Sequence, residues 1–358
     1  MNNAYDAIVI GAGIIGTSAA YYLTKAGQKV LVLEKNEIAS GSTGSCNGGL
    51  SYFGKQGKEL LWAKESLELY QEIGRNFKNS IEIEQGRDIY LIAKNDEEES
   101  YIDQLIAACQ QVKLSAEKLN KQELLRRVTC LSHNFQMGAV ANGGLHGFVN
   151  THDFSLKLLE YVVAQGGVVK TGCKVLALIK KHGAVVGVQT SDGIIYSEAI
   201  VNATANAANE LMPDRDLGLE PYQGIVLVTE QTPFNLPGNI LSANFFQHID
   251  GIPNLAIEET LHHNLLIGSS RKLEGRVQEL DYNTIISIVK NALSYLPCLA
   301  ELEIIRIFAG IRPQRKAGIL LGEDEELKNL FWAIGFSSMG ITLAPYAGKT
   351  IAKMIIER

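Results

Sequence analysis

Cysteine and proline are scarce in this sequence, and neither sign of charge dominates. The 358 residues include 5 Cys and 8 Pro, with 33 Lys and Arg against 39 Asp and Glu. The cysteines are odd in number, far apart and without a CxxC pair, at Cys46, Cys109, Cys130, Cys173 and Cys298. This pattern excludes a disulfide framework and the usual spacing of a zinc site, and it indicates a reducing compartment.

Long apolar runs and a basic excess are also lacking. No run approaches the roughly 20 residues of a spanning helix, and the N-terminus lacks the pattern of a secretory signal. The net charge is −6 and the basic residues are scattered, which argues against a nucleic-acid partner. We therefore expect a cytoplasmic protein with no membrane span. At ~150 residues per domain, the length indicates two or three domains.

A strand, a glycine turn and a helix open the chain. The apolar run from Ala4 to Ile10 predicts a strand buried in a parallel sheet, and a helix is predicted from Thr17 to Ala26. Between them, Gly11, Gly13 and Gly16 form GxGxxG. In this motif Gly11 permits the sharp turn, Gly13 lets the backbone approach a pyrophosphate, and Gly16 lets helix and strand pack closely. The sequence therefore predicts a dinucleotide site.

An acidic residue completes this module. The next predicted strand, Lys29 to Leu33, ends at Glu34, which lies 18 residues beyond Gly16. A carboxylate at this place accepts hydrogen bonds from ribose hydroxyls and repels a 2′-phosphate. The motif by itself leaves NAD and FAD open.

The remaining chain alternates helical and extended patterns. Helices are predicted at 57–77, from Asn95 onward, at 153–165, 282–296 and 341–356. Strands are predicted at 81–83, 89–93, 168–171, 174–180, 184–190, 194–201, 223–230, 255–258, 265–268 and 330–335. The apolar face of the helix at 57–77 is expected to comprise Leu61, Leu69, Tyr70, Ile73 and Phe77. The glycine-rich stretch 38–50 is predicted to be a ligand loop.

Five motifs in order make the chain resemble the FAD-dependent D-amino-acid oxidase superfamily, in particular the glycine oxidase and sarcosine oxidase group. They are IVIGAGIIG at 8–16, STGSCNGGL at 42–50, EAIVNATA at 198–205, AGIRP at 309–313 and GFSSMGITLAPYAG at 335–348. The group includes β subunits of hydrogen cyanide synthase, hydroxyproline or proline dehydrogenase and opine oxidase. The resemblance covers nearly the whole chain.

The resemblance implies an α/β fold in two interleaved domains. A Rossmann-like FAD-binding domain would comprise residues 1–80, 142–215 and 318–358. An α+β substrate-binding domain, built on an antiparallel sheet, would comprise residues 81–141 and 216–317. Several chain crossings between the domains are therefore expected.

The implied cofactor is noncovalent FAD. Sarcosine oxidases attach FAD through a cysteine near the AGIRP region, and this chain has none after Cys298. The resemblance implies these cofactor-binding residues: Gly11, Gly13, Ile14, Ile15, Gly16, Glu34, Lys35, Ser42, Thr43, Cys46, Asn47, Gly48, Gly49, Val175, Ala203, Gly310, Ser338, Gly340, Ile341 and Thr342. Cys46 is better explained as a small apolar space-filler than as a nucleophile.

The implied reaction is oxidation of a small amino or imino acid, such as glycine, sarcosine, a D-amino acid or D-hydroxyproline. Hydride would pass from the α-carbon to flavin N5 and leave an imine. Arg312 of AGIRP matches the family arginine that clamps the substrate carboxylate, a role suited to its planar fork. Tyr222, Phe245 and Phe246 are candidates for the substrate pocket, with core packing as the equal alternative.

Several alternatives stay open. The chain can be a β subunit that passes electrons to a second electron-transfer subunit instead of oxygen, a flavin-binding module without turnover, or an NAD-dependent enzyme. A homo-oligomer is also open. His248, His262 and His263 have no carboxylate or cysteine in register, so a metal site is not favoured.

The sequence departs from the family pattern at three segments. Lys316 to Gly318 replace a DG pair that usually follows the AGIRP arginine, and Ala205 stands where the family often has glycine. The segment from Pro221 to Gly224 also lacks the basic residue usual there. These departures leave the identity of the substrate open.

Overall fold

Separate stretches of chain assemble into two units in the computed structural model, which describes residues 5–247, 254–273, 275–277 and 279–358. Unit 1 comprises residues 1–45, 150–221 and 312–358, and unit 2 comprises residues 46–149 and 222–311. Residues 46–80 thus group with unit 2, whereas the sequence placed them with the FAD-binding domain. Residues 142–149 also group with unit 2, and residues 216–221 and 312–317 group with unit 1, which differs from the predicted bounds. Strand pairing joins the first two segments to unit 2, since residues 147–148 pair with Gly49 and Leu50, and residues 147–149 pair with residues 83–85.

The main sheet of unit 1 is parallel except at one edge. Its strands lie in the order β20 (Leu320–Glu323), β21 (Leu330–Ile334), β13 (Ala199–Asn202), β1 (Ala7–Ile10), β2 (Val30–Leu33) and β9 (Val168–Lys170). Only β20 runs antiparallel to its neighbour. All four residues of β1 are buried, as the continuous apolar run predicts for a central parallel strand.

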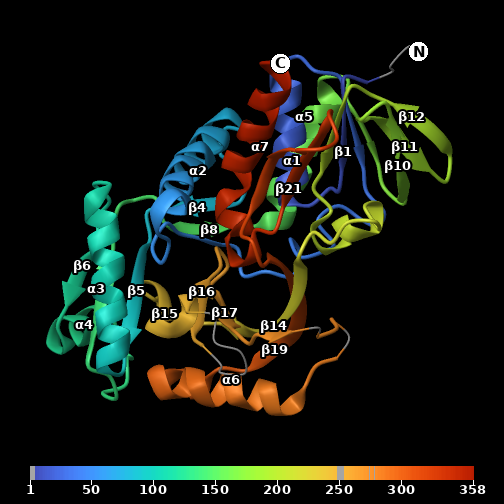
Figure 1. Cartoon of the computed structure of the whole chain (residues 1–358). Coiled ribbons are helices and arrows are strands. Elements are labelled where there is room, and N and C mark those ends of the chain that lie inside the picture. The colour runs from blue at the N-terminus through green and yellow to red at the C-terminus, as the bar shows by residue number, and fades with distance from the viewer. Residues whose placement is uncertain (1–4, 248–253, 274, 278) are drawn as a thin grey trace. The chain divides into compact units, whose positions relative to one another are not determined.

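Helices cover one face of this sheet and a second sheet covers the other. Helices α1 (Ile14–Lys25), α5 (Thr151–Ala164) and α7 (Gly340–Ile356) lie together beside β1 and β21 (Figure 1). The helices α1 and α7 pack so closely that a Cβ on Gly348 would lie 2.4 Å from the carbonyl carbon of Ser18. The second sheet consists of β10 (Val175–Lys181), β11 (Ala184–Thr190) and β12 (Gly193–Tyr196). Ile8 and Leu31 of the main sheet and Val188 of the second sheet belong to one buried hydrophobic cluster.

Unit 2 is built on a nine-stranded, mostly antiparallel sheet. Its path is β18 (Lys272–Leu273), β14 (Leu219–Gln231), β17 (Asn264–Gly268), β16 (Ala256–Glu259), β15 (Gly238–Ser242), β5 (Asp88–Ala93), β7 (Met137–Ala141) and β6 (Glu117–Leu119), with β19 (Ile304–Arg315) paired to β14. A small sheet orders β3 (Gly49–Leu50), β8 (Gly147–Val149) and β4 (Ile83–Gln85). The α/β class predicted from the sequence is confirmed.

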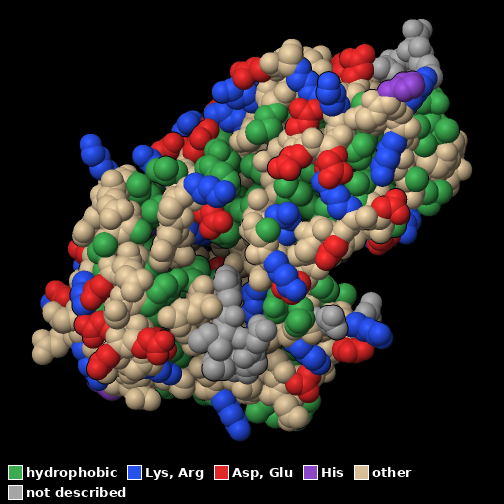
Figure 2. Space-filling model, viewed as in Figure 1, with side chains coloured by type: hydrophobic (Ala, Val, Ile, Leu, Met, Phe, Trp, Pro, Cys, Tyr) green, Lys and Arg blue, Asp and Glu red, His purple; other side chains and the backbone are tan. Residues whose placement is uncertain are grey.

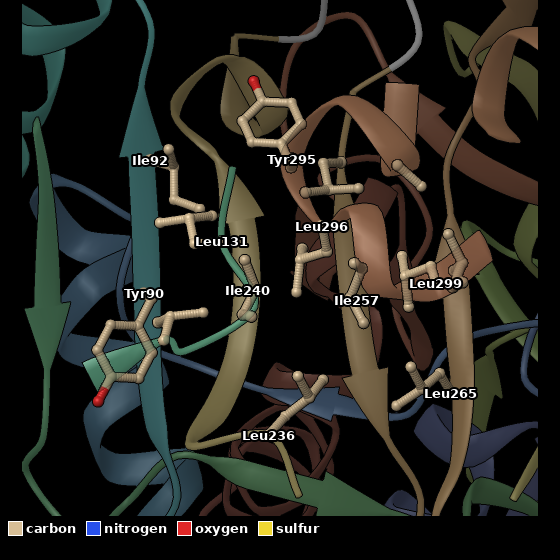
Figure 3. Packing of buried hydrophobic residues seen from close by; sticks show 14 of the residues in the cluster. Tyr90, Ile92, Leu131, Leu236, Ile240, Ile257, Leu265, Tyr295, Leu296 and Leu299 are labelled. Atoms are coloured by element: carbon tan, nitrogen blue, oxygen red, sulfur yellow. The ribbon is translucent and has the colours of Figure 1, made fainter. Parts of the chain in front are cut away.

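One face of the large sheet carries the core of unit 2. Ile92, Ile240 and Ile257 project from β5, β15 and β16 into a cluster that includes Tyr295 and Leu299 from the helical segment α6 (Tyr282–Tyr295) and η3 (Pro297–Glu301) (Figure 3). Helix α6 thus covers this face. It ends just before Pro297, as predicted, because proline cannot continue the hydrogen-bond ladder.

The sequence analysis predicted the start of one further helix of unit 2 from its capping signal and missed that of another. The other helices of this unit are α2 (Gly57–Asn76), α3 (Asp96–Gln111) and α4 (Lys121–Arg127). The start signal at Asn95 is confirmed, since its side chain accepts the Glu98 N–H at 2.9 Å. The same N-x-x-E signal at Asn120 and Glu123 forms a capping box that begins α4, which the sequence analysis missed.

Two details of the sequence prediction are wrong. Leu61 is 51% exposed, because the buried stripe of α2 runs through Leu60 and Leu67 instead. The strand predicted at 194–201 is two strands, β12 and β13, which belong to different sheets. Ser197 separates them, and its hydroxyl donates to the carbonyl of Asp6 at 3.0 Å.

The described residues contain no helix long and apolar enough to cross a bilayer. Acidic and basic side chains are interspersed over the face shown in Figure 2. This mixture agrees with the nearly balanced composition. Besides η3, the described residues form three short 3-10 helices, namely η1 (Ala205–Leu211), η2 (Ala243–Phe246) and η4 (Ser337–Met339).

Replacing Ala205 with glycine should stabilise the protein. Ala205 has a φ of 54°, in the left-handed region that side chains disfavour. Glycine adopts this region without the steric cost, so we expect a gain of about 1 kcal/mol in the free energy of unfolding. Thermal or denaturant unfolding measures it. The matched control Ala207→Gly, in the same 3-10 helix, should instead lose stability, and an equal loss in both variants would contradict the argument.

Candidate functional site

At the glycine turn between β1 and α1, backbone segments approach one another too closely for a side chain to fit between them. Gly11 has a φ of +103°, and a Cβ there would lie 2.7 Å from the carbonyl oxygen of Ala203. A Cβ on Gly16 would lie 2.0 Å from the carbonyl oxygen of Gly11. Neither clash involves a flexible group that can move aside. Glycine is therefore required at both positions by the packing of the turn itself.

The first turn of α1 presents backbone N–H groups. Its N-cap, Gly13, supplies no side-chain cap, and the Oγ1 of Thr43 accepts the Ile14 N–H at 3.0 Å. Thr43 is held in turn by Thr151, whose hydroxyl donates to the Thr43 carbonyl at 2.7 Å. Ile15 follows Ile14 in the same turn. This arrangement suits an anion, because the end of a helix carries partial positive charge.

Glu34 lies at the end of β2 beside this turn. One carboxylate oxygen accepts the Ala12 N–H at 2.8 Å, and the other accepts the Asn36 N–H at 2.8 Å. A carboxylate offers about four acceptor positions, so capacity remains for ribose hydroxyls. The backbone of Glu34 is also joined to the segment just before β10, since the Cys173 N–H donates to the Glu34 carbonyl at 2.8 Å. Val175, predicted at the adenine, is buried at the start of that strand.

Of the other predicted cofactor residues of unit 1, one lies at the glycine turn and two are partly or largely exposed. Ala203 lies against the glycine turn, with its N–H donating to the Ile10 carbonyl at 2.9 Å. Lys35 is on the surface, 4.0 Å from a Glu210 carboxylate oxygen, and Ser42 is half-buried. The ion pair of Lys35 is exposed and contributes little stability.

The beginning of α7 lies beside the end of β19. The first turn of α7 contains Gly340, Ile341 and Thr342, and it directly follows η4, which contains Ser338. A bridge between residues 314 and 336 joins the end of β19 to this segment. Arg312 lies on that part of β19 and is half-buried. Unit 1 thus combines the predicted guanidinium with a helix N-terminus, while Gly310 is buried on the portion of β19 in unit 2.

In unit 2 the predicted cofactor segment Cys46 to Gly49 meets a buried acid. Glu258 accepts hydrogen bonds from the Gly49 N–H and from the side chain of Asn47. A Cβ on Gly49 would lie 2.0 Å from Oε1 of Glu258, and one on Gly48 would lie 2.4 Å from the Val149 carbonyl oxygen. Burial raises the pKa of Glu258 to about 7, although these hydrogen bonds and Lys55 lower it.

A buried base lies near this acid. Lys55 is buried, and desolvation lowers its pKa to about 8 against the attraction of Glu59, Cys109 and Glu258. His146 is fully buried, and burial together with Lys55 lowers its pKa to about 3, so its ring stays neutral. Sequence analysis missed all of Lys55, His146 and Glu258. Three titratable residues from distant segments gave no local spacing signal that could have revealed them.

The predicted substrate-pocket residues lie in unit 2. Tyr222 is buried, and the Arg271 guanidinium lies 4.0 Å from the centre of its ring. Phe245 and Phe246 form an edge-to-face pair with centroids 5.0 Å apart. The Phe246 ring fills the space beside Gly54, where a Cβ would come within 2.3 Å of it. Phe246 therefore has a packing role whether or not it also meets a substrate.

The histidine interpretation needs a correction. His263 does have a carboxylate in register, because its Nδ1 lies 2.6 Å from an oxygen of Glu259. His262 lies 4.0 Å from Glu82 at the surface, and His248 lies outside the described residues. Among the residues that the structure describes, no group of three or more His, Cys, Asp or Glu side chains is placed to hold a metal ion.

Comparison with known proteins gives matches along the entire chain. The family described as FAD dependent oxidoreductase (DAO) matches residues 6–354. Glycine oxidase of Bacillus licheniformis is 26% identical over 381 residues, covering 99% of this chain and 94% of its own. Hydrogen cyanide synthase subunit HcnC of Pseudomonas aeruginosa is 22% identical over 407 residues, covering 100% and 94%. The crystal structure of glycine oxidase from Bacillus cereus superposes with a TM-score of 0.88 at 26% identity, covering 99% of this chain and 95% of that one.

Gly16→Ala should abolish flavin binding. The added Cβ would meet the Gly11 carbonyl oxygen at 2.0 Å, so the turn must open and its N–H groups lose their alignment. The ratio of flavin to protein absorbance in the purified protein measures the loss. Gly74→Ala is the matched control, because its Cβ would meet only Asn79 at 3.7 Å within a helix. Full flavin content in Gly16→Ala would contradict this account of the turn.

Proposed function

We propose that this chain, which belongs to the DAO family of FAD-dependent oxidoreductases, oxidises a small amino or imino acid at its α-carbon. The family assigns FAD as the cofactor, so the NAD alternative is set aside. Glycine, sarcosine, D-amino acids and D-hydroxyproline define the substrate class. The likeness to glycine oxidases over 99% of the chain supports this choice.

The residues of unit 1 fit the ADP half of FAD. The first turn of α1, whose N-cap Gly13 has no side chain, suits the pyrophosphate, and Glu34 retains acceptor capacity for the ribose hydroxyls. The first turn of α7 offers a second positive helix end. We assign that end to the flavin, where it would stabilise negative charge on the reduced ring. The predicted cofactor residues listed above are proposed contacts on this basis.

The single observation that carries the substrate class is Arg312 within AGIRP. It lies half-buried on β19, joined by the bridge at residues 314 and 336 to the segment that starts α7. A guanidinium makes two parallel charge-assisted hydrogen bonds to a carboxylate and so fixes the α-carbon in one position. We therefore assign the substrate carboxylate to Arg312.

The chemistry then follows from position. FAD supplies the two-electron acceptor. The nitrogen lone pair forms the C=N bond while hydride leaves the α-carbon, and water hydrolyses the resulting imine. The task of this chain is to hold the C–H bond in line, which accounts for a large share of rate enhancement in such reactions. Tyr222, Phe245 and Phe246 are proposed to shape the substrate pocket.

Removing the guanidinium tests the proposal. A panel of amino and imino acids mixed anaerobically with the protein should include one that bleaches the flavin. Arg312→Ala should lower kcat/KM for that substrate at least about 100-fold, because charge-assisted hydrogen bonds contribute about 1.5–3 kcal/mol each. Arg306→Ala, an exposed residue of the same strand, is the matched control. A protein that keeps its flavin and bleaches with no member of the panel would instead be a flavin-binding module.

A second candidate differs in the electron acceptor. The whole-chain likeness to HcnC, a synthase subunit, favours transfer to a partner subunit instead of oxygen. In that case the substrate-reduced protein should reduce an artificial dye quickly and form hydrogen peroxide slowly. Stopped-flow reoxidation by oxygen and by the dye measures the two rates, and rapid peroxide formation would exclude this candidate.

Release of FAD on denaturation tests the noncovalent attachment.

A further inference from the structure

Two of the five cysteines lie together in unit 2, although 168 residues separate them along the chain. Cys130 lies just after α4, and Cys298 is the second residue of η3. The thiol of Cys298 donates a hydrogen bond to the sulfur of Cys130. Both are free thiols, and both residues are half-buried. Their spacing in the sequence gave no sign of this pair, because only the folded chain brings the two segments together.

Hydrogen bonds and core packing hold these two segments side by side. The Ser132 N–H donates to the Tyr295 carbonyl at 2.7 Å, and the Ser132 hydroxyl donates to the Ser294 carbonyl at 2.7 Å. Leu131 and Leu299, which directly follow the two cysteines, belong to the buried cluster of unit 2 (Figure 3). Both cysteines pack against that same cluster. The contact between the thiols is therefore built into the fold, and a disulfide needs such close segments.

We propose that Cys130 and Cys298 form a reversible disulfide when the protein meets a low-molecular-weight disulfide such as oxidised glutathione. The crosslink would fasten the segment after α4 to η3, next to the end of the helix that covers the core of unit 2. Half-burial leaves both residues accessible to a small oxidant, whereas Cys109 and Cys173 are buried. The inference is independent of the proposed function, since neither Cys130 nor Cys298 is a predicted cofactor or substrate residue.

The order of attack follows from a difference between the two thiols. Burial raises the pKa of Cys298 to about 12, together with the hydrogen bond to Cys130 and the charge of Cys130. Cys298 therefore stays protonated at neutral pH, and Cys130 attacks first, because the thiolate is the nucleophile. Once Cys130 is joined to glutathione it carries no charge. Two causes of the raised pKa of Cys298 are then removed, so Cys298 loses its proton more readily and completes the exchange.

The exchange balances in atoms and electrons. Cys130 gives its proton to solvent, and its thiolate attacks one sulfur of oxidised glutathione, whose S–S bond breaks. One glutathione leaves as a thiolate and takes up a proton. Cys298 then gives its proton to solvent and attacks the Cys130 sulfur, which releases the second glutathione in the same way. The two cysteines together lose two electrons and two protons, and the oxidised glutathione gains them.

Mapping the thiols of the folded wild-type protein tests the pair. After treatment with oxidised glutathione, the protein is denatured, its remaining thiols are alkylated, and its peptides are weighed without reduction. The thiols of Cys130 and Cys298 should disappear in equal amounts and reappear as one crosslinked peptide pair. Dithiothreitol should restore both thiols. A wild type that keeps both thiols, or that ends with glutathione on Cys130 beside a free Cys298, would overturn the proposal.

Single substitutions test the order of attack. Cys298→Ser should retain glutathione on Cys130, because no second thiol displaces it. Cys130→Ser should react at least about 10-fold more slowly at neutral pH, because burial still favours the protonated thiol of Cys298. Cys109→Ala, which removes a buried thiol of the same unit, is the matched control and should form the crosslink as the wild type does. Equal rates of modification in Cys130→Ser and Cys298→Ser would contradict this order.

The crosslink should also raise the melting temperature of the protein. It closes a long loop of the unfolded chain and so reduces the entropy of that state, which predicts a rise of roughly 5–10 °C on oxidation. Cys298→Ser treated in the same way should show no rise, because its adduct closes no loop. Equal melting temperatures for the oxidised and reduced wild type would overturn the role of the crosslink in fastening the two segments.

Discussion

The close approach of three backbone segments at the glycine turn is the constraint on which unit 1 depends. Gly16 lies against the carbonyl of Gly11, and Gly11 lies against the carbonyl of Ala203. Any side chain at these glycines would separate β1, α1 and the end of β13. Within the same turn, the Ala12 N–H donates to the Glu34 carboxylate. Fold and anion site are therefore one structural requirement, and a change in either disturbs both.

Unit 2 contains a similar close approach at a different glycine. Gly49 makes room for the Glu258 carboxyl group, which in turn holds the Asn47 side chain and the Gly49 backbone. The charge of Lys55 offsets part of the cost of burying this acid. The segment that the family resemblance assigns to the flavin is thus fixed by an ionisable group of this chain. That arrangement connects the shape of the loop to its protonation state.

Local patterns in the sequence were sufficient for much of the fold. The apolar run before Gly11, the cap at Asn95 and the stop at Pro297 each act over a few residues, and each appears in the structure where expected. The error at Leu61 arose because a helix with mixed polarity permits more than one apolar stripe. The division of 194–201 into two strands depends on pairing with distant segments, which no local pattern encodes.

The sequence alone determined the family, the glycine turn with Glu34, and Arg312 as the candidate for the substrate carboxylate, because these residues fall within short motifs. Only the tertiary structure brought Glu258, Lys55 and His146 together, from β16, the turn before α2 and the segment before β8. The physical reason is burial. Desolvation shifts the pKa of a side chain only once distant segments have excluded water from it, and spacing along the chain does not record that event.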